Sequence, residues 1–121
     1  MTDKNIAIAL YRPHAGKEQE LHEIVREHGP ALKREGLITE LPLLQLEAED
    51  GTVIEIFEWK SEEAKRQAHS SPVIWPIWER MMAVAEMTGL GSLKEAAQPF
   101  PNFRRLDSSQ RLAELNDAPH R

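Results

Sequence analysis

Hydrophobic residues near the start of the chain follow the two-residue period of a strand. Over residues 6–11, three aliphatic side chains alternate with two alanines and a tyrosine: Ile6, Ile8 and Leu10 against Ala7, Ala9 and Tyr11. Both faces of this predicted strand are therefore apolar. A strand of that kind has to be covered on both sides.

The next segment, residues 17–35, has the three- and four-residue spacing of an amphipathic helix. Its apolar stripe consists of Leu21, Ile24, Val25, His28 and Leu32. Because proline cannot donate the helical hydrogen bond, we expect Pro30 to kink the helix or to restart it after Gly29. Gly36 is a typical residue to end the helix.

Two strand-like segments, 41–46 and 53–57, flank the dipeptide Asp50-Gly51. Asp-Gly favours a tight turn in which both residues take positive φ, so the pattern predicts a β-hairpin. Pro42 cannot donate to a sheet ladder. We therefore expect the first strand of the hairpin to lie at a sheet edge or to begin after Pro42.

Two further helices are predicted after the hairpin. Ser61 can cap the first, which covers about residues 62–69. Ser71-Pro72 repeats the same start signal, and the second helix runs from there to about Met87. Its apolar positions have helical spacing over that whole length.

A short strand at 103–106 completes the order β-α-β-β-α-β. This is the ferredoxin-like arrangement of an α+β fold, with a four-stranded antiparallel sheet. Helices in that arrangement cover one face of the sheet. The other face would expose the apolar strand 6–11, which is more than a soluble monomer normally shows. We therefore expect a homodimer in which a second copy covers this face.

The composition is that of a single soluble domain, with 121 residues, a formal net charge of −5 and no cysteine. An acidic chain without a basic stripe argues against nucleic acid or an anionic membrane as partner. No signal peptide is visible and no apolar run could span a bilayer, so we expect a cytoplasmic protein. The lack of cysteine excludes disulfides and thiolate chemistry.

Three stretches of the chain carry a family resemblance: residues 26–37, residues 50–61 ending in Glu-Trp-Lys-Ser, and Ala68-His-Ser-Ser-Pro-Val73 followed by Trp78. Together they resemble the antibiotic-biosynthesis-monooxygenase-like (ABM-like) domains of the dimeric α+β barrel superfamily. The resemblance covers about residues 5–106. We therefore assign residues 1–106 as one ABM-like, ferredoxin-like domain and residues 107–121 as a polar C-terminal tail.

The family includes cofactor-independent oxygenases of aromatic polyketides and haem-degrading enzymes. The resemblance therefore implies a small apolar or aromatic ligand and, for an oxygenase, no cofactor. Haem degradation is disfavoured, because the family's Asn, Trp and His positions fall on Ala9, Ala68 and Trp78. An alignment shifted by one residue would place His69 at the Trp position without restoring the missing His.

Tyr11, His28 and His69 are the candidate catalytic residues for acid–base chemistry. His28 is either a core histidine bonded to a backbone carbonyl or a base in a pocket. His69 ends the helix at 62–69, where it either interacts with the negative helix terminus or faces a pocket. No histidine spacing is typical of a metal site, so we predict no metal.

The tryptophans allow two interpretations, because they either pack in the core and the dimer interface or form the wall of a planar-ligand pocket. In the second case the ligand-binding residues are Ala9, Phe57, Trp59, Trp75 and Trp78. Two functions stay open: a cofactor-independent monooxygenase, and a non-enzymatic small-molecule-binding or stress-related dimeric module. A histidine or tyrosine that faces a cavity would favour the first, and solid packing the second.

Overall fold

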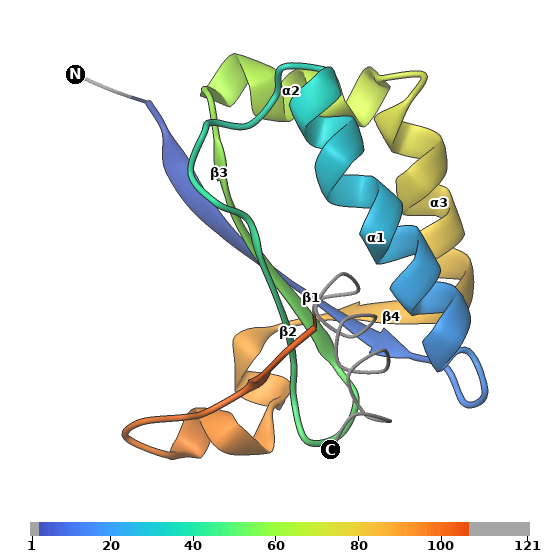
Figure 1. The fold of residues 1–121 in the computed structure, drawn as a ribbon, viewed down its shortest axis with the longest axis vertical. Helices are drawn as coiled ribbons and strands as arrows, with labels where there is room; N and C mark the ends of the chain where they lie inside the picture. The colour runs from blue at the N-terminus through green and yellow to red at the C-terminus, as the bar shows by residue number, and fades with distance from the viewer. Residues whose placement is uncertain (1–2, 107–121) are drawn as a thin grey trace, which may run out of the picture.

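The computed structural model describes residues 3–106, and the predicted tail at 107–121 lies outside them. Its strands are β1 (Asn5–Pro13), β2 (Leu44–Glu47), β3 (Val53–Trp59), β4 (Ala85–Thr88) and β5 (Arg104–Arg105). Its helices are α1 (Glu18–Arg34), α2 (Glu62–Ser70) and α3 (Ile74–Val84), with short 3₁₀ helices at η1 (Leu90–Ser92) and η2 (Lys94–Ala97). The α-helices lie on one side of the sheet (Figure 1).

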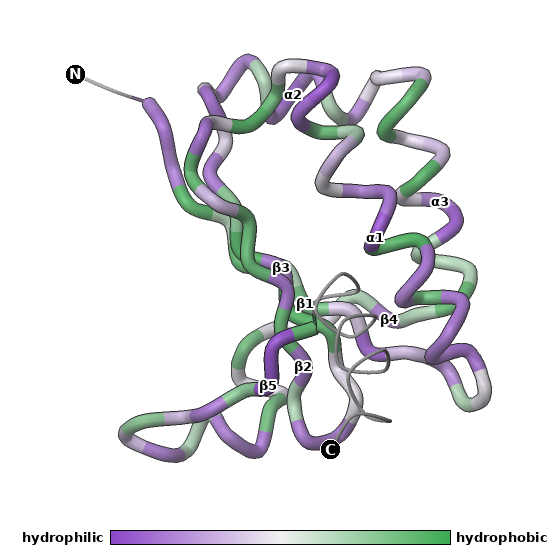
Figure 2. The backbone as a smooth tube through the Cα atoms, in the orientation of Figure 1, coloured by the Kyte–Doolittle hydropathy of each residue, from purple (hydrophilic) through white to green (hydrophobic). Residues whose placement is uncertain are grey.

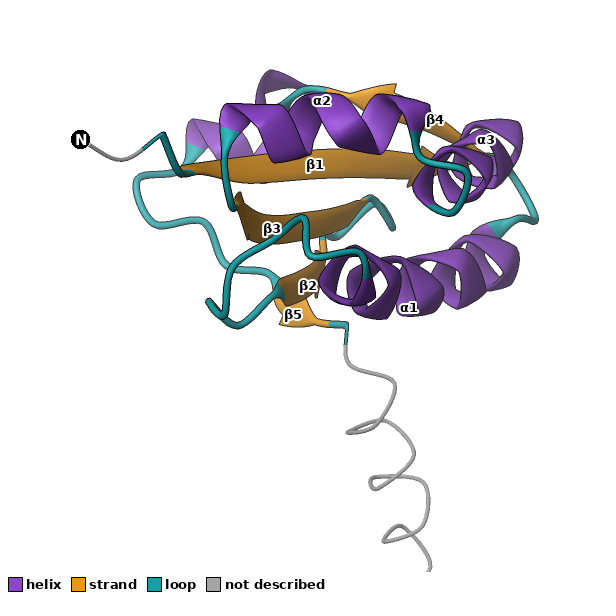
Figure 3. Ribbon diagram, turned by 90° about the horizontal axis from the view of Figure 1, so that it is seen from above, coloured by secondary structure: helices purple, strands orange, loops and turns teal. Residues whose placement is uncertain are grey.

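The predicted α+β fold is confirmed, but the antiparallel sheet has five strands rather than four, in the order β4-β1-β3-β2-β5 (Figure 3). The added strand is β4, where the sequence predicted the end of a helix. Helix α3 stops at Val84, and the following residues pair with β1, Tyr11 opposite Met87. Pairing with β4 supplies partners for backbone groups of β1 that would otherwise form an open edge. The hydrophobic pattern of α3 alone does not reveal that residues 85–88 pair with β1 instead of continuing the helix.

Helix α1 buries its predicted stripe, and every one of the five stripe residues is buried. It continues through Pro30, so the expected restart after Gly29 is wrong. Gly29 and Ala31, the neighbours of Pro30, are both buried, and Pro30 itself is exposed. The helix ends as predicted at Gly36, which has φ +69°.

The hairpin between β2 and β3 is present, and β2 begins after Pro42 as one of the two alternatives expected. Its turn differs from the predicted type, because only Gly51 has positive φ. Asp50 instead accepts a hydrogen bond from the backbone N–H of Thr52 at 2.9 Å, which stabilises a longer loop. Strand β2 is internal, since β5 pairs with its far side.

The predicted cap at Ser61 is confirmed, whereas α3 starts later than the Ser71-Pro72 signal predicted and has Val73 as its N-cap residue. The Ser61 hydroxyl accepts a hydrogen bond from the backbone N–H of Ala64 at 3.0 Å, which caps α2. The Ser71 hydroxyl accepts from the N–H of Ile74 at 3.0 Å, and α3 begins there rather than at Pro72.

The strand register places two rows of side chains across β1, β3 and β2, on opposite faces of the sheet. The helix-facing row is Ala9, Glu55 and Gln45, and the outer row is Ile8, Ile56 and Leu44. Figure 2 shows the hydrophobic stretches of β1 and β3 running side by side. The alternation predicted for residues 6–11 therefore holds.

The outer face of the sheet is covered at one end only. Leu10 and Ile54 are buried there in a small cluster with Leu93, from the segment that follows β4. At the other end Ile6 and Ile8 remain 48% and 46% exposed. The expectation of a bare outer face is thus correct for only part of the sheet, because the chain's own C-terminal segment covers the rest.

Candidate functional site

Glu55 is a carboxylate in the middle of β3 that is completely buried. Its Oε1 accepts hydrogen bonds from the Tyr11 hydroxyl at 2.6 Å and from His28 Nδ1 at 2.7 Å. Its Oε2 accepts one from Gln45 Nε2 at 3.0 Å. A buried charge is tolerated only when it is paired and hydrogen-bonded, and Glu55 has three such donors.

The proton on His28 is located by Trp78. The indole Nε1–H donates to His28 Nε2 at 2.8 Å. Because an indole nitrogen can only donate, Nε2 must accept, and the ring proton lies on Nδ1. Nδ1 then donates to Glu55, so a directed chain of hydrogen bonds runs from Trp78 through His28 to the carboxylate.

The pKa values of this buried network favour a charged Glu55 and a protonated Tyr11. Burial acts to raise the pKa of Glu55, but the interaction with His28 and the hydrogen bonds from Tyr11 and Gln45 outweigh it and hold that pKa below its ordinary value. Burial raises the pKa of Tyr11, and the negative charge of Glu55 raises it further. At neutral pH, Tyr11 is therefore a donor and Glu55 an acceptor.

Glu55 and Gln45 were missed in the sequence analysis. The signal for Glu55 was available: it is a single charged residue in the apolar run Val53–Phe57, on the same strand face as the two ends of that run. Gln45 is its register partner on β2 and gave no comparable signal, because a glutamine in a strand next to a loop is common at surfaces.

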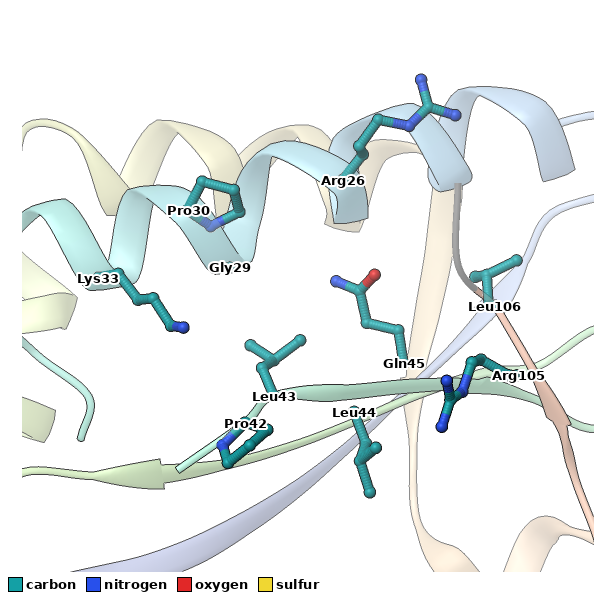
Figure 4. A pocket seen from close by; sticks show the side chains of 10 residues that line it. All are labelled: Arg26, Gly29, Pro30, Lys33, Pro42, Leu43, Leu44, Gln45, Arg105 and Leu106. Atoms are coloured by element: carbon teal, nitrogen blue, oxygen red, sulfur yellow. The ribbon is translucent and has the colours of Figure 1, made fainter. Parts of the chain in front are cut away.

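Gln45 connects the buried network to an open cleft of about 680 Å³ between α1 and β2 (Figure 4). Its amide donates to Glu55 and, at 3.1 Å, to the carbonyl of Val25. Both side-chain amide hydrogens are thereby used, and within residues 3–106 the side-chain oxygen Oε1 of Gln45 has no hydrogen-bond donor, whereas its backbone carbonyl accepts from the N–H of Leu106 at 2.7 Å. A volume of this size falls in the usual range of small-molecule sites.

The cleft combines an apolar interior with cationic side chains. Its lining residues are Arg26, Gly29, Pro30, Lys33, Pro42, Leu43, Leu44, Gln45, Arg105 and Leu106. Leu43, just before β2, points toward α1, and Lys33 extends from α1 toward Leu43 (Figure 4). Arg26 points away from β2, and Arg105 lies on the same side of the sheet as Leu44. No carboxylate is among the lining residues.

The three candidate catalytic residues lie near one another but outside the lining of this cleft. Tyr11 and His28 meet at Glu55 in the core. The partner of His28 is thus a buried carboxylate, which neither sequence-based interpretation named. His69 is exposed, donates from Nδ1 to the carbonyl of Lys65 at 3.0 Å, and lies edge-on to Trp78 with ring centroids 5.1 Å apart. The catalytic role of all three stays a prediction.

The predicted aromatic residues form a chain of edge-to-face contacts around His28. Phe57 lies 5.1 Å from Trp59 and 6.1 Å from His28, and Trp75 lies 6.0 Å from Trp78, between ring centroids. Phe57 and Trp59 are buried in the main core, and Ala9 is partly buried against that core. These five residues do not line the cleft, and their part in ligand binding stays a prediction.

Over residues 3–106, no three His, Cys, Asp or Glu side chains are grouped so that they could hold a metal ion. In the same part of the chain, none of the helices combines the length and apolarity needed to cross a membrane.

No family model and no curated protein matches this chain. Solved structures do. SnoaB, a cofactor-independent oxygenase from Streptomyces nogalater, aligns with a TM-score of 0.60 at 19% identity, over 71% of this chain and 87% of that one. The chain has the ABM-like fold.

Two further structures agree with that fold assignment. A proposed antibiotic biosynthesis monooxygenase from Nitrosomonas europaea aligns with a TM-score of 0.58 at 11% identity, over 74% of this chain and 93% of that one. A conserved protein of unknown function from Bacteroides thetaiotaomicron, named as a possible oxidoreductase, gives 0.60 at 14% identity, over 73% and 94%. At such identities the likeness of this ABM-like chain to its neighbours concerns the fold alone.

Proposed function

We propose that this ABM-like protein is a homodimer that binds a small apolar or aromatic molecule in the cleft between α1 and β2. The observation that carries the proposal is the cleft itself, about 680 Å³ in volume, with an apolar interior and the Gln45 amide at its base. Leu43 and Pro30 offer apolar contact from opposite sides. The side-chain oxygen Oε1 of Gln45 can accept one hydrogen bond that orients the ligand.

The proposed dimer uses the outer face of the sheet. Ile6, Ile8 and Leu44 are 48%, 46% and 40% exposed there, and Ile56 lies between the last two in register. Contiguous exposed apolar side chains of this kind favour an interaction surface. A second copy that covers this patch would bury more than roughly 1,200 Å² in total.

The first candidate activity is cofactor-independent monooxygenation, which is the activity named for SnoaB. In such a reaction an electron-rich ligand methylene becomes a carbonyl: one oxygen atom of O₂ enters the product, and the other leaves as water with the two methylene hydrogens. The ligand supplies all the electrons, and the protein has to move a proton and exclude water. Tyr11, His28 and His69 are the proposed acid–base groups, with Glu55 as the charge that holds the first two.

The second candidate is a non-enzymatic binding module, and one observation favours it. Both ring nitrogens of His28 and the hydroxyl of Tyr11 are hydrogen-bonded within the protein. None of these atoms belongs to a residue that lines the cleft. A ligand in the cleft would then contact Gln45 without reaching an acid or base directly.

The test of the proposed function is a thermal-shift and calorimetric screen of quinols and flavonoid-like phenols on the full chain. Pro30→Trp is the blocking variant, because its indole would occupy the cleft while the helix gains an N–H that proline lacks. Gln19→Trp, at an exposed position of α1 outside the cleft, is the matched control. We expect binding to be lost in the first variant and retained in the second.

Oxygen uptake separates the two candidate activities. A ligand that binds is mixed with the protein in chelator-treated buffer, and dissolved oxygen is followed together with the product mass. Consumption of one O₂ per carbonyl formed supports the oxygenase. Binding without oxygen uptake supports the non-enzymatic module. Binding that Pro30→Trp leaves unchanged would contradict the proposed site for both.

A further inference from the structure

We propose that Gln45 is a specificity-determining residue of the cleft, which selects ring compounds that donate a hydrogen bond, such as a phenol or an aryl amine, over compounds that only accept one. This inference rests on the proposed function, because it concerns the ligand of the same cleft. It goes beyond that function in requiring a donor group at a defined place on the ligand.

The side-chain amide of Gln45 is held in one orientation by two acceptors. Its Nε2 lies 3.0 Å from Glu55 Oε2 and 3.1 Å from the backbone carbonyl oxygen of Val25. Neither an ionised carboxylate nor a carbonyl can donate a hydrogen bond. Turning the amide over would bring Oε1 against both of these oxygens and leave them without a donor. Nε2 is therefore committed to the protein, and Oε1 is the atom left for a ligand.

Oε1 of Gln45 is accessible from the cleft. Gln45 is only half-buried and lines the cleft, and its Oε1 is not among the side-chain atoms of residues 3–106 that are buried without a hydrogen-bond partner. Figure 4 shows the side chain directed from β2 toward α1, on the same side as Leu43. In the described part of the chain no group donates to Oε1. A donor from outside the protein can therefore occupy this position.

The lining residues beside Gln45 offer apolar contact to a ring. Leu43 and Leu106 both line the cleft and are partly buried against the main core, and the N–H of Leu106 donates to the Gln45 backbone carbonyl at 2.7 Å. Lys33 extends toward Leu43 (Figure 4), but an ammonium group can only donate. Lys33 would therefore favour an acceptor on the ligand, and Gln45 is the group that favours a donor.

The buried charge of Glu55 strengthens Oε1 of Gln45 as an acceptor. An amide that donates to a carboxylate is polarised toward a more negative oxygen, and hydrogen bonds in such a chain reinforce one another. Glu55 is itself held by Tyr11 and His28. A ligand hydroxyl that donates to Oε1 extends this chain. A methoxy or keto oxygen at the same place would face another acceptor and be repelled.

The experiment compares two probes with the same ring system by calorimetry on the full chain: 2-naphthol, which can donate, and 2-methoxynaphthalene, which can only accept. The measurement is made at neutral pH, where 2-naphthol keeps its proton. We expect 2-naphthol to bind about tenfold more tightly, as the effect of one hydrogen bond to a polarised acceptor. Pro30→Trp should abolish the binding of both probes, because both occupy the same cleft.

Two matched variants locate the effect. Gln45→Met removes the acceptor from the cleft at similar side-chain length, and Gln67→Met makes the same replacement at an exposed position of α2 outside the cleft. We expect the affinity ratio of the two probes to fall about tenfold in Gln45→Met and to keep the parental value in Gln67→Met. Because one ratio is compared across variants, differences in size and hydrophobicity between the probes cancel.

A measurement on the parent protein decides the case in which Gln45→Met fails to fold, since that variant also removes the donor to Glu55 and Val25. The carbon NMR shift of the Gln45 side-chain carbonyl reports hydrogen bonding at Oε1. We expect this shift to change when 2-naphthol is added and to stay constant when 2-methoxynaphthalene is added. The same response to both probes would contradict a selective hydrogen bond at Oε1.

Two further results would overturn the inference, and they differ from failure of the proposed function. Equal affinity of the parent for the two probes, with the binding of both abolished by Pro30→Trp, would refute the donor requirement and leave the cleft as the binding site. A preference for 2-naphthol that persists in Gln45→Met would assign the selection to another group. Absence of binding by both probes and by the phenol panel would refute the proposed function and this inference together.

Discussion

Glu55 and Ile56 are adjacent in β3, and each has register partners on β1 and β2, but their surroundings differ. Glu55 faces the helices in a row with Ala9 and Gln45, and its charge is satisfied inside the subunit by three donors. Ile56 faces the opposite side in a row with two aliphatic side chains that are 46% and 40% exposed. A charged side chain is thus buried, whereas the apolar row that begins one residue later is partly exposed to solvent.

The contrast shows that the two faces of the sheet are stabilised by different interactions. The helix-facing row can bury a charge because the sequence supplies specific hydrogen-bond donors from β1, α1 and β2. In the outer row, Ile56 packs against the cluster in which Leu93 covers Leu10 and Ile54, whereas Ile8 and Leu44 remain exposed. We therefore expect mutations in the helix-facing row to lower the free energy of unfolding, and mutations in the outer row to weaken dimerisation.

The largest expected effect is from Glu55→Ala. It would leave the Tyr11 hydroxyl, the His28 Nδ1–H and one Gln45 N–H unpaired in the core, and should lower the free energy of unfolding by about 3–5 kcal/mol. Urea denaturation at fixed protein concentration measures it. Glu58→Ala on the same strand, whose carboxylate accepts from Thr39 near the surface, is the control and should lose about 1 kcal/mol or less. Equal losses in the two variants would mean that the buried hydrogen bonds of Glu55 stabilise the fold no more than the surface hydrogen bond of Glu58.

Ile8→Glu tests the outer row. A charge in the centre of the proposed interface should weaken dimerisation about 100-fold, since each Ile side chain removed from a contact loses about 1.5–3 kcal/mol of burial. Light scattering across a concentration series measures the mass. Met82→Glu, at a similarly exposed apolar residue on α3, is the matched control and should leave the mass unchanged. A monomeric parent protein at micromolar concentration would contradict the proposed dimer.

Trp78→Phe isolates one hydrogen bond of the helix-facing row. The smaller phenyl ring keeps an aromatic side chain at this position, but His28 Nε2 loses its donor and becomes an unsatisfied buried acceptor, so we expect a loss of about 1–3 kcal/mol from the hydrogen bond in addition to the cost of the lost ring volume. Nitrogen NMR of the His28 ring provides a second reading, because the parent should show the proton on Nδ1 alone. A parent ring protonated on Nε2 would refute the directed chain from Trp78 to Glu55.

The smallest expected effect is a difference between the parent and Glu55→Gln in how the free energy of unfolding depends on pH. Because folding lowers the pKa of Glu55, its contribution to stability is fully present above the unfolded-state value of about 4.3 and is lost as pH falls through the folded-state pKa. Unfolding free energies between pH 7 and pH 3 should therefore fall more steeply for the parent than for Glu55→Gln.

Two exposed carboxyls supply an internal reference for that profile. Hydrogen bonds from Arg80 and from Thr52 lower the pKa values of Glu27 and Asp50, respectively, and these contributions are the same in parent and variant. The difference between the two profiles then excludes these two carboxyls and reports the Glu55–His28 pair. Parallel profiles would contradict a lowered pKa at Glu55.

Local patterns predicted most elements of the fold, because the information for them lies within a few residues. The two-residue period assigned the two faces of β1, the helical stripe assigned the buried side of α1, and Ser61 and Gly36 marked helix ends through their own hydrogen bonds or φ angle. β4 was missed because its extended conformation depends on pairing with β1, some 75 residues earlier in the chain.

The candidate site depends on contacts that no local pattern contains. Tyr11 and His28 were identified from residue type and position, but their meeting point, Glu55, required β1, α1 and β3 to pack together first. The cleft likewise exists only where α1 passes over β2 and β5 joins the sheet. By itself the sequence determined most of the elements and the buried side of each, whereas only the tertiary structure decided which polar groups are hydrogen-bonded to one another and where a cleft opens. The physical reason is that side-chain periodicity acts over a few residues, while hydrogen-bond partners and cavities are set by chain segments brought together through burial of the core.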